Sequence, residues 1–192
     1  MSESFTDLLR HASRGDEATW SSLFNLYAPS VLGFLRGAGA SEPEDQLSEV
    51  FLQVARDLHT FTGDESNFRA WLFTIARNRM LDALRTRQRR PVTPVDWQSY
   101  IATSQELAET GPVANDEITA NIDMYRLLEV LNPLERDIIM LRFVADLDTK
   151  TVGRIVGKRA NTVAATTRRA LEKLRKPARF KDPQNFFGEA VT

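Results

Sequence analysis

The chain has 192 residues, 42% of them hydrophobic and 27% charged, which is typical of a globular protein that buries a core and unlike a disordered chain. It contains no cysteine and only two histidines, His11 and His59, which excludes a disulfide framework and a thiolate metal site. No run approaches 18 apolar residues and no signal peptide opens the chain, so we expect a cytoplasmic protein without membrane insertion.

The first forty residues carry apolar side chains at three- and four-residue steps, which predicts helices rather than strands. Residues 5–9 open a first helix, and residues 20–27 belong to a second. We expect Pro29 and Ser30 to interrupt this second helix, because proline lacks the amide hydrogen that an inner helical turn requires. The stretch Gly37-Ala-Gly39 is expected to break the helix again.

Two further helices are predicted before residue 90. Ser41 is expected to cap the first of them, with Glu44 three residues on, and this helix runs through Leu58. A turn-rich loop at residues 60–67 separates it from residues 68–85, whose spacing predicts one long helix. We expect at least one of Phe68, Trp71 and Phe73 to lie in the core.

Periodicity fades over residues 91–117, where prolines and acidic residues predict a flexible linker. Its apolar residues are more numerous than a free tether needs, so we expect part of it to dock on a domain or a partner; they are Val95, Trp97, Tyr100 and Ile101. The sequence therefore predicts an all-α protein of two small helical domains, at residues 1–90 and 118–180, joined by this linker and followed by a tail at 181–192.

The second domain is expected to begin with a helix through Ile122, Tyr125, Leu128 and Leu131. A new helix starts at Asn132 and Pro133, because asparagine suits the cap and proline the first turn, and it should end near Asp146.

Residues 148–175 predict a helix-turn-helix. Asp148 can cap a short helix over residues 149–156 that stops at Gly157, and Asn161 is expected to cap a longer basic helix. The second helix of such a pair can lie in the major groove of DNA. The candidates for reading base edges are Asn161, Thr162, Ala165, Thr166 and Arg169, and those for phosphate contacts are Lys158, Arg159, Arg168 and Lys173.

The net charge of −1 hides a strong asymmetry along the chain. Residues 69–90 carry seven basic side chains and one acidic, and residues 149–181 carry eleven and one, whereas residues 1–60 carry four and nine and residues 91–137 two and nine. Clustered lysine and arginine attract a phosphate backbone whatever its sequence, so two basic blocks predict two nucleic-acid contacts. Two solvated helix faces are the alternative interpretation.

The first basic block interleaves aromatic residues with arginines, a combination that can stack on unpaired bases and hold a single-stranded backbone. Residues 45–52, 68–72, 75–78 and 82–85 together resemble conserved region 2 of the extracytoplasmic-function (ECF) group of sigma-70 family sigma factors. Residues 128–136, the helix-turn-helix and residues 169–175 resemble region 4 of the same family, in the same order and spacing.

This resemblance implies an RNA polymerase sigma factor. The helix over residues 45–58 would bind the clamp helices of the largest core polymerase subunit, through Asp45, Ser48, Glu49, Phe51 and Leu52. The loop at 60–67 and the helix after it would capture the melted −10 element, through Phe61, Asn67, Arg69, Trp71, Arg77, Asn78 and Arg85. The C-terminal domain would bind the −35 duplex through the helix-turn-helix candidates above and would touch the flap of the second-largest subunit.

The same resemblance implies a protein that is a monomer when free and an anti-sigma factor that clasps both domains. It implies no catalytic residue, no cofactor and no metal. Two positions depart from the family pattern: Ser48 replaces a usual glutamine, and residues 164–166 are Ala-Ala-Thr where a cation and serine are common. Since small apolar groups can meet a thymine methyl, we hypothesise that the duplex is read through shape and methyl contacts.

Three other classes compete with this interpretation. An enzyme is disfavoured because neither a nucleophile constellation nor a phosphate-binding glycine loop is present. A stand-alone helix-turn-helix regulator would explain residues 120–176 and would bind duplex as a symmetric dimer, but it leaves the first basic block without a role. A degenerate sigma homologue would bind polymerase without starting transcription.

Overall fold

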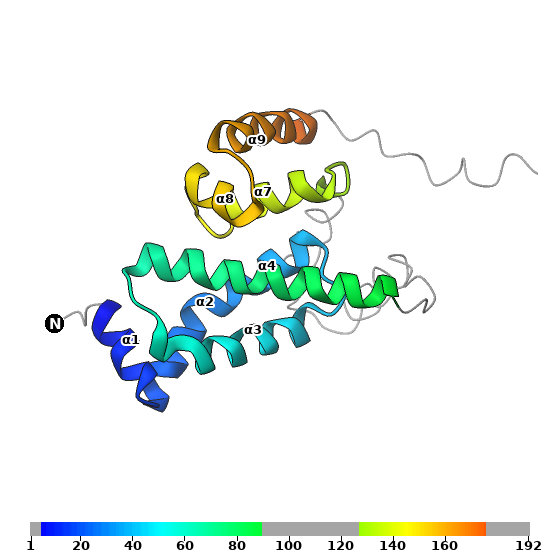
Figure 1. The fold of residues 1–192 in the computed structure, drawn as a ribbon. Coiled ribbons are helices and arrows are strands. Elements are labelled where there is room, and N and C mark those ends of the chain that lie inside the picture. Colours follow the sequence, from blue (N-terminus) through cyan, green and yellow to red (C-terminus); the bar gives the residue numbers. More distant parts are fainter. Residues whose placement is uncertain (1–4, 90–126, 176–192) are drawn as a thin grey trace, which may run out of the picture.

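The computed structural model describes residues 5–89 and 127–175, and within these ranges the chain forms helices and turns with no strand. The first group comprises α1 (Phe5–Ser13), α2 (Glu17–Ala38), α3 (Pro43–Asp57), the short 3-10 turn η1 (Leu58–Thr60) and α4 (Glu65–Arg89). The second group comprises α7 (Pro133–Phe143), α8 (Thr149–Val156) and α9 (Ala160–Arg175), and it lies against α2 and α4 (Figure 1). The predicted all-α fold with two helical domains is confirmed. The predicted linker and tail, with Ile122 and Tyr125, lie outside the described residues.

An aromatic cluster holds the first group together. The fully buried ring of Phe68 in α4 lies 5.5 Å from Phe5, 5.2 Å from Tyr27 and 5.6 Å from Phe61, measured between ring centroids. Tilted and edge-to-face contacts of this kind stabilise a core beyond the area they bury. Both Phe68 and Phe73 are core residues, which confirms the prediction that at least one aromatic residue of this helix is buried.

The predicted interruption at Pro29 is wrong, because α2 runs unbroken from Glu17 to Ala38 with Pro29 inside it. Proline costs a helix one hydrogen bond, but the apolar side chains on both sides of it are anchored in the core. Leu23 precedes Pro29 and Val31 and Phe34 follow it, all without measurable exposure. Tertiary packing has therefore outweighed the local preference, and the helix ends only at Gly39, which adopts a left-handed φ of 93°.

Predictions of helix caps had mixed outcomes. Asn132 and Glu135 form a complete capping box, and Asp148 accepts hydrogen bonds from the backbone at Lys150 and Thr151, as expected. Two caps were predicted wrongly. The N-cap of α3 is Glu42, whose side chain makes no capping hydrogen bond. The predicted cap, Ser41, lies one residue before the true N-cap. Asn161 lies inside the first turn of α9, because that helix already begins at Ala160.

Two glycines shape the turn of the helix-turn-helix. Gly157 follows α8 with a left-handed φ of 67°, and the α8 residue Gly153 faces the turn. A Cβ on Gly153 would lie 2.6 Å from the carbonyl oxygen of Lys158, closer than real contacts allow. Gly153 therefore provides space, whereas Gly157 provides a backbone conformation that other residues rarely adopt.

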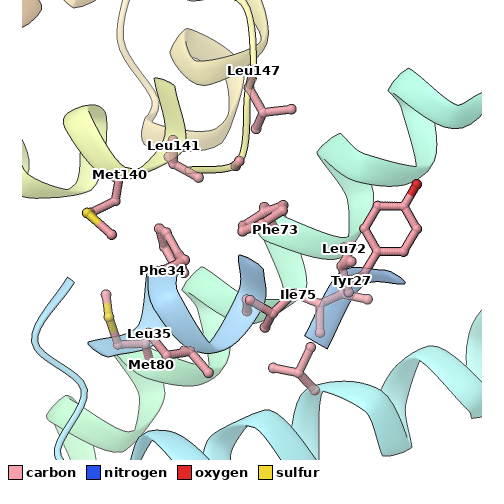
Figure 2. Packing of buried hydrophobic residues seen from close by; sticks show 14 of the residues in the cluster. Tyr27, Phe34, Leu35, Leu72, Phe73, Ile75, Met80, Met140, Leu141 and Leu147 are labelled. Atoms are coloured by element: carbon pink, nitrogen blue, oxygen red, sulfur yellow. The ribbon is translucent and has the colours of Figure 1, made fainter. Parts of the chain in front are cut away.

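The two groups of helices share one continuous core. Glycines Gly33 and Gly37 lie one turn apart on α2 and face α7: a Cβ on Gly33 would be 3.7 Å from Val144, and one on Gly37 would be 2.6 Å from the sulfur of Met140. Figure 2 shows Met140 and Leu141 of α7 pointing toward Phe34 of α2. Because glycine removes the side chain from its own helix, α7 can approach α2 closely. We call the surface formed by Gly33 and Gly37 the glycine notch.

Substituting Gly153 with alanine should destabilise the protein by about 1–3 kcal/mol through overpacking against a backbone atom, although alanine is the better helix former. Thermal unfolding followed by circular dichroism measures the effect. Gly157→Asn is the matched control, because asparagine tolerates the left-handed region and nothing lies within 4 Å of its added Cβ. Equal unfolding temperatures for Gly153→Ala and the parent protein would contradict the described turn.

Candidate protein and nucleic-acid interfaces

The outer face of α3 presents four of the five predicted polymerase contacts. Asp45, Ser48, Glu49 and Leu52 are all exposed, and their spacing of three, one and three residues places them on one helical stripe. The Leu52 side chain is 63% exposed, which is unusual for a leucine in the middle of a helix. An apolar side chain flanked by carboxylates is a surface suited to an apolar and basic partner.

The fifth predicted contact, Phe51, lies in the core of the first group. Its side chain is 4% exposed, and its ring lies 4.6 Å from Phe24 and 6.4 Å from Trp20. The structure therefore gives Phe51 the role of fixing α3 on α2, with its neighbour Leu52 facing outward.

The loop before α4 is closed by reciprocal hydrogen bonds. The backbone of Asn67 donates to the carboxylate of Asp64 at 2.8 Å, and the backbone of Asp64 donates to the side-chain oxygen of Asn67 at 3.3 Å. Gly63, with a φ of 150°, packs against the Cβ of Asn67 and leaves no room for another side chain. Phe61 then lies on Trp71, with ring centroids 5.1 Å apart and planes inclined by 34°. The structure thus brings Phe61 and Trp71 together at the start of α4. Asn67 is exposed in the first turn of this helix, because α4 already begins at Glu65 and the predicted loop at residues 60–67 is shorter than expected.

The polar residues predicted for the same site differ in their accessibility. Asn78 is exposed, and Arg85 is exposed and pairs with the nearby Asp82. Arg69 pairs with Glu65 at 3.0 Å and reaches across to Asp146 of the second group at 3.2 Å. Arg77 is largely covered: its side chain is 15% exposed, and its Nε donates to Asp137 of α7 at 2.8 Å.

The pair formed by Arg77 and Asp137 is the most buried ion pair among the described residues, since the Asp137 side chain is only 8% exposed. Burial raises the pKa of Asp137, and the positive charges of Arg77 and Arg136 offset part of that rise. Sequence reasoning did not single out Asp137 or Gly33, and it named Gly37 only as part of a helix break. The glycine spacing of four residues was a usable signal for close helix packing, but nothing local marks Asp137 as the partner of Arg77, 60 residues earlier.

The outer face of α9 carries exposed basic side chains. Ala165 is half-buried on this face, whereas Thr166 is 5% exposed and points into the domain, where it accepts a hydrogen bond from Arg169. The remaining candidates are exposed: Lys158, Arg159, Asn161, Thr162, Arg168, Arg169 and Lys173.

Lys173 is committed to a contact within the domain. Its ammonium group donates to both carboxylate oxygens of Glu135, at 2.7 and 2.8 Å, and so joins the end of α9 to the capping box of α7. This hydrogen bond lowers the pKa of Glu135, burial opposes the shift, and the bond to the Asn132 backbone and the charges of Lys173 and Arg169 support it. The sequence predicted a phosphate contact for Lys173. In the structure its ammonium group pairs with Glu135 instead and holds α9 on α7.

Lys173→Met should destabilise the protein, and more at neutral than at acid pH. With a folded-state pKa below the unfolded value, ionised Glu135 contributes stability above its ordinary pKa, and this is lost as the pH falls through the folded value. Unfolding temperatures at pH 7 and pH 3 measure the difference, with Lys173→Arg, which keeps the charge, as control. A Lys173→Met penalty that is the same at both pH values would contradict the pairing.

The described ranges contain no helix long and apolar enough to cross a membrane and no cluster of three or more potential metal-ligating side chains. The arrangement offers surfaces for binding, formed by α3, by the start of α4 and by α9.

Comparison with known proteins shows the family of the chain. Residues 23–90 match sigma-70 region 2, and residues 127–176 match sigma-70 region 4. The ECF RNA polymerase sigma factor RpoE of Cereibacter sphaeroides is 31% identical over 162 residues, covering 83% of this chain and 86% of that protein. The ECF sigma factor BldN of Streptomyces coelicolor is 28% identical over 176 residues; the match covers 88% of this chain and 63% of BldN.

A solved structure shares the fold. The sigma factor RpoE of Bartonella quintana, in complex with the anti-sigma factor NepR, matches 80% of this chain and 92% of its own, with a TM-score of 0.58 and 20% identity. The matches to regions 2 and 4, which together span more than half of the chain, make this protein a sigma factor of the sigma-70 type. Within that class, the chain belongs to the ECF RNA polymerase sigma factors.

Proposed function

We propose that this protein recruits core RNA polymerase to promoters, with α9 reading a −35 element as duplex and α4 with its preceding loop capturing a melted −10 element. The observation that carries this proposal is the presence of both surfaces in one chain: a helix-turn-helix with an exposed basic face, and an α4 whose aromatic start adjoins arginines. A duplex fits a groove-sized helix, whereas a melted strand needs rings and cations. Two such sites gain affinity when they are joined in one chain.

The α3 face would bind the clamp helices of the largest polymerase subunit. Leu52 would supply the apolar centre of this interface, and Asp45 and Glu49 would supply its charged rim. Ser48 would leave a small gap between them, since its hydroxyl donates to the Glu44 carbonyl of its own helix. Phe51 would act indirectly, by holding α3 on α2.

The −10 strand would meet the start of α4. Phe61 and Trp71 offer ring surface, Asn67 and Asn78 offer exposed amides, and Arg85 offers charge further along the helix. Arg69 and Arg77 would join this surface only after leaving their partners in the second domain.

The −35 duplex would meet the exposed residues of α9 and of the turn before it. Asn161, Thr162, Ala165 and Arg169 would read base edges, while Lys158, Arg159 and Arg168 would neutralise phosphates. Thr166 and Lys173 would support the helix from within the domain.

The proposal extends to the partners of the protein and to its cellular compartment. The second domain would also touch the flap of the second-largest subunit, and the protein would act in the cytoplasm, where polymerase is found, without catalysing a reaction. An anti-sigma factor is proposed as a further partner, because the RpoE of Bartonella quintana with the same fold was solved with one.

Transcription in vitro tests the proposal as a whole. The purified protein is added to core polymerase and a pool of promoter fragments, and the 5′ ends of the transcripts are sequenced. Defined start sites that depend on the protein support it, and their alignment gives both elements and the spacer. Binding to duplex as a dimer, with no dependence on polymerase, would contradict it and favour a stand-alone regulator.

Leu52→Asp should weaken binding to core polymerase by about tenfold or more, because it places a charge at the centre of the proposed interface. Titration of core polymerase with a fluorescently labelled protein measures this affinity. Ser22→Asp is the control, since it adds the same charge at an exposed position of α2 outside the proposed interfaces. Equal losses in the two variants, or none in either, would refute the α3 interface.

Ala165→Lys should change which −35 sequences are preferred, because a long cation replaces a methyl group at the groove-facing surface of α9. Selection from a randomised −35 library in the transcription assay measures the preference. Ser22→Lys adds the same charge on exposed α2, outside the proposed interfaces, and should only raise affinity slightly for all sequences. An unchanged preference with Ala165→Lys would rule out methyl readout at this position.

A further inference from the structure

A single carboxylate stands in the first basic block. Residues 69–90 carry seven arginines and one acidic residue, Asp82. Its side chain is 64% exposed and accepts a hydrogen bond at 2.9 Å from Nη1 of Arg85, one turn later on α4 and itself 66% exposed. In Figure 1 the last turns of α4 extend past the helices of the second group, so this pair faces solvent.

The pair shares a helical stripe with other side chains proposed for the −10 strand. This stripe proceeds by steps of seven, four and three residues, through Trp71, Asn78, Asp82 and Arg85. Such steps return to the same face of an α-helix. Asp82 therefore lies within the proposed promoter surface and not beside it.

Three arginines earlier on α4 point elsewhere. Arg69 and Arg77 pair with carboxylates of the second domain. Arg79 donates through Nε to the side chain of Gln53 on α3, at 3.0 Å. Arg85 instead pairs within its own helix, with an exposed partner, and so keeps its guanidinium on the open face of α4.

The charge of Asp82 is unfavourable for holding DNA in general. A carboxylate repels a phosphate backbone, so a surface that only held a strand would bind it more tightly without this side chain. An exposed ion pair three residues apart on a helix also contributes little to stability. What remains is the effect of Asp82 on the direction of the Arg85 side chain.

The bond between the two residues leaves one edge of the guanidinium open. Arginine carries five N–H donors in a rigid plane, and a carboxylate that accepts from Nη1 leaves Nε and Nη2 for a second, two-pronged contact. Guanine presents two acceptors side by side on its major-groove edge, O6 and N7. An arginine without such an anchor turns readily to the nearest phosphate, a contact that carries no sequence information.

We propose that Asp82 is a positioning residue for base readout at the −10 element: it holds Arg85 so that Nε and Nη2 bind O6 and N7 of a guanine in the promoter. This inference rests on the proposed function, because it takes the open stripe of α4 as a promoter surface. It adds the base that this part of α4 prefers and the residue that sets the preference.

A promoter library randomised over the −10 element and its flanking positions tests the proposal, in the transcription assay with core polymerase. The parent protein should enrich guanine at one position, on one of the two strands. Asp82→Ala should lower this enrichment by about tenfold, within the discrimination that a bidentate arginine contact provides. Arg85→Lys keeps the charge but lacks the fork of donors, so it should lose the same preference.

Two controls separate positioning from a general effect of charge. Asp7→Ala on α1 removes another exposed carboxylate that pairs with an arginine three residues away, outside the proposed interfaces, and should leave the preference unchanged. Asp82→Ala should bind guanine-free single-stranded DNA, as holoenzyme, at least as tightly as the parent protein, because a negative charge is lost. Uniform weakening of all sequences by Asp82→Ala would overturn the proposal.

Replacing the enriched guanine with 7-deazaguanine removes the N7 acceptor and tests the contact at one atom. Holoenzyme with the parent protein should lose about tenfold in affinity for the promoter fragment, whereas holoenzyme with Asp82→Ala should lose little more than it already has. Equal losses with and without Asp82 would refute the positioning role.

The same assay distinguishes this inference from the proposed function. Transcripts that depend on the parent protein, with a guanine preference that Asp82→Ala leaves unaltered, would overturn the inference alone. Failure of the parent protein to start any transcript would refute the proposed function and the inference with it.

Discussion

The close approach of α7 to α2 at the glycine notch determines how the rest of the described chain is arranged. Met140 reaches the Phe34 region only because Gly37 has no side chain, and this places Asp137, three residues earlier on α7, over Arg77 of α4. Burying an arginine and a carboxylate costs solvation that only good geometry offsets, so such a pair is stable only while the apolar contact beside it excludes water. Packing and charge at this interface therefore depend on each other.

The residues proposed for binding fall into an exposed set and a covered set. Leu52 on α3 and the basic residues of α9 are exposed, while Arg77, and in part Arg69, are held by the second domain. Under the proposed function, the exposed α3 face would meet polymerase while Arg77 is still paired with Asp137. Arg77 and Arg69 would become available only afterwards, when separated DNA is present.

Much of the fold follows from local sequence, because caps and helix periods are local interactions. Asn132 with Glu135, and Asp148 before α8, were predicted from the sequence since a cap needs only its own first turn. Pro29 was misjudged because the core contacts that keep α2 intact come from α3 and α4, distant in sequence.

Which side chains of a candidate site point outward was harder to predict than where its helix lies. Phe51 and Leu52 are adjacent in a motif that resembles a family pattern, but only the packing of Phe24 and Trp20 shows which of the two points inward. Thr166 and Lys173 likewise sit in a basic helix, and their partners lie within their own domain. The Arg77 contact joins two domains across the linker, so no periodicity within either helix could reveal it.

The most direct test of the promoter contacts proposed for Arg77 and Arg69 is the distance between the two domains in the working protein, because both arginines must first leave the second domain. Spin labels on Ser22→Cys in α2 and Glu172→Cys in α9, both exposed, report it by pulsed electron paramagnetic resonance. The account predicts one narrow distance distribution for the free protein, replaced by a longer distance when core polymerase and promoter DNA are added together. A broad distribution in the free protein, or a narrow one that promoter complex formation leaves unchanged, would contradict it.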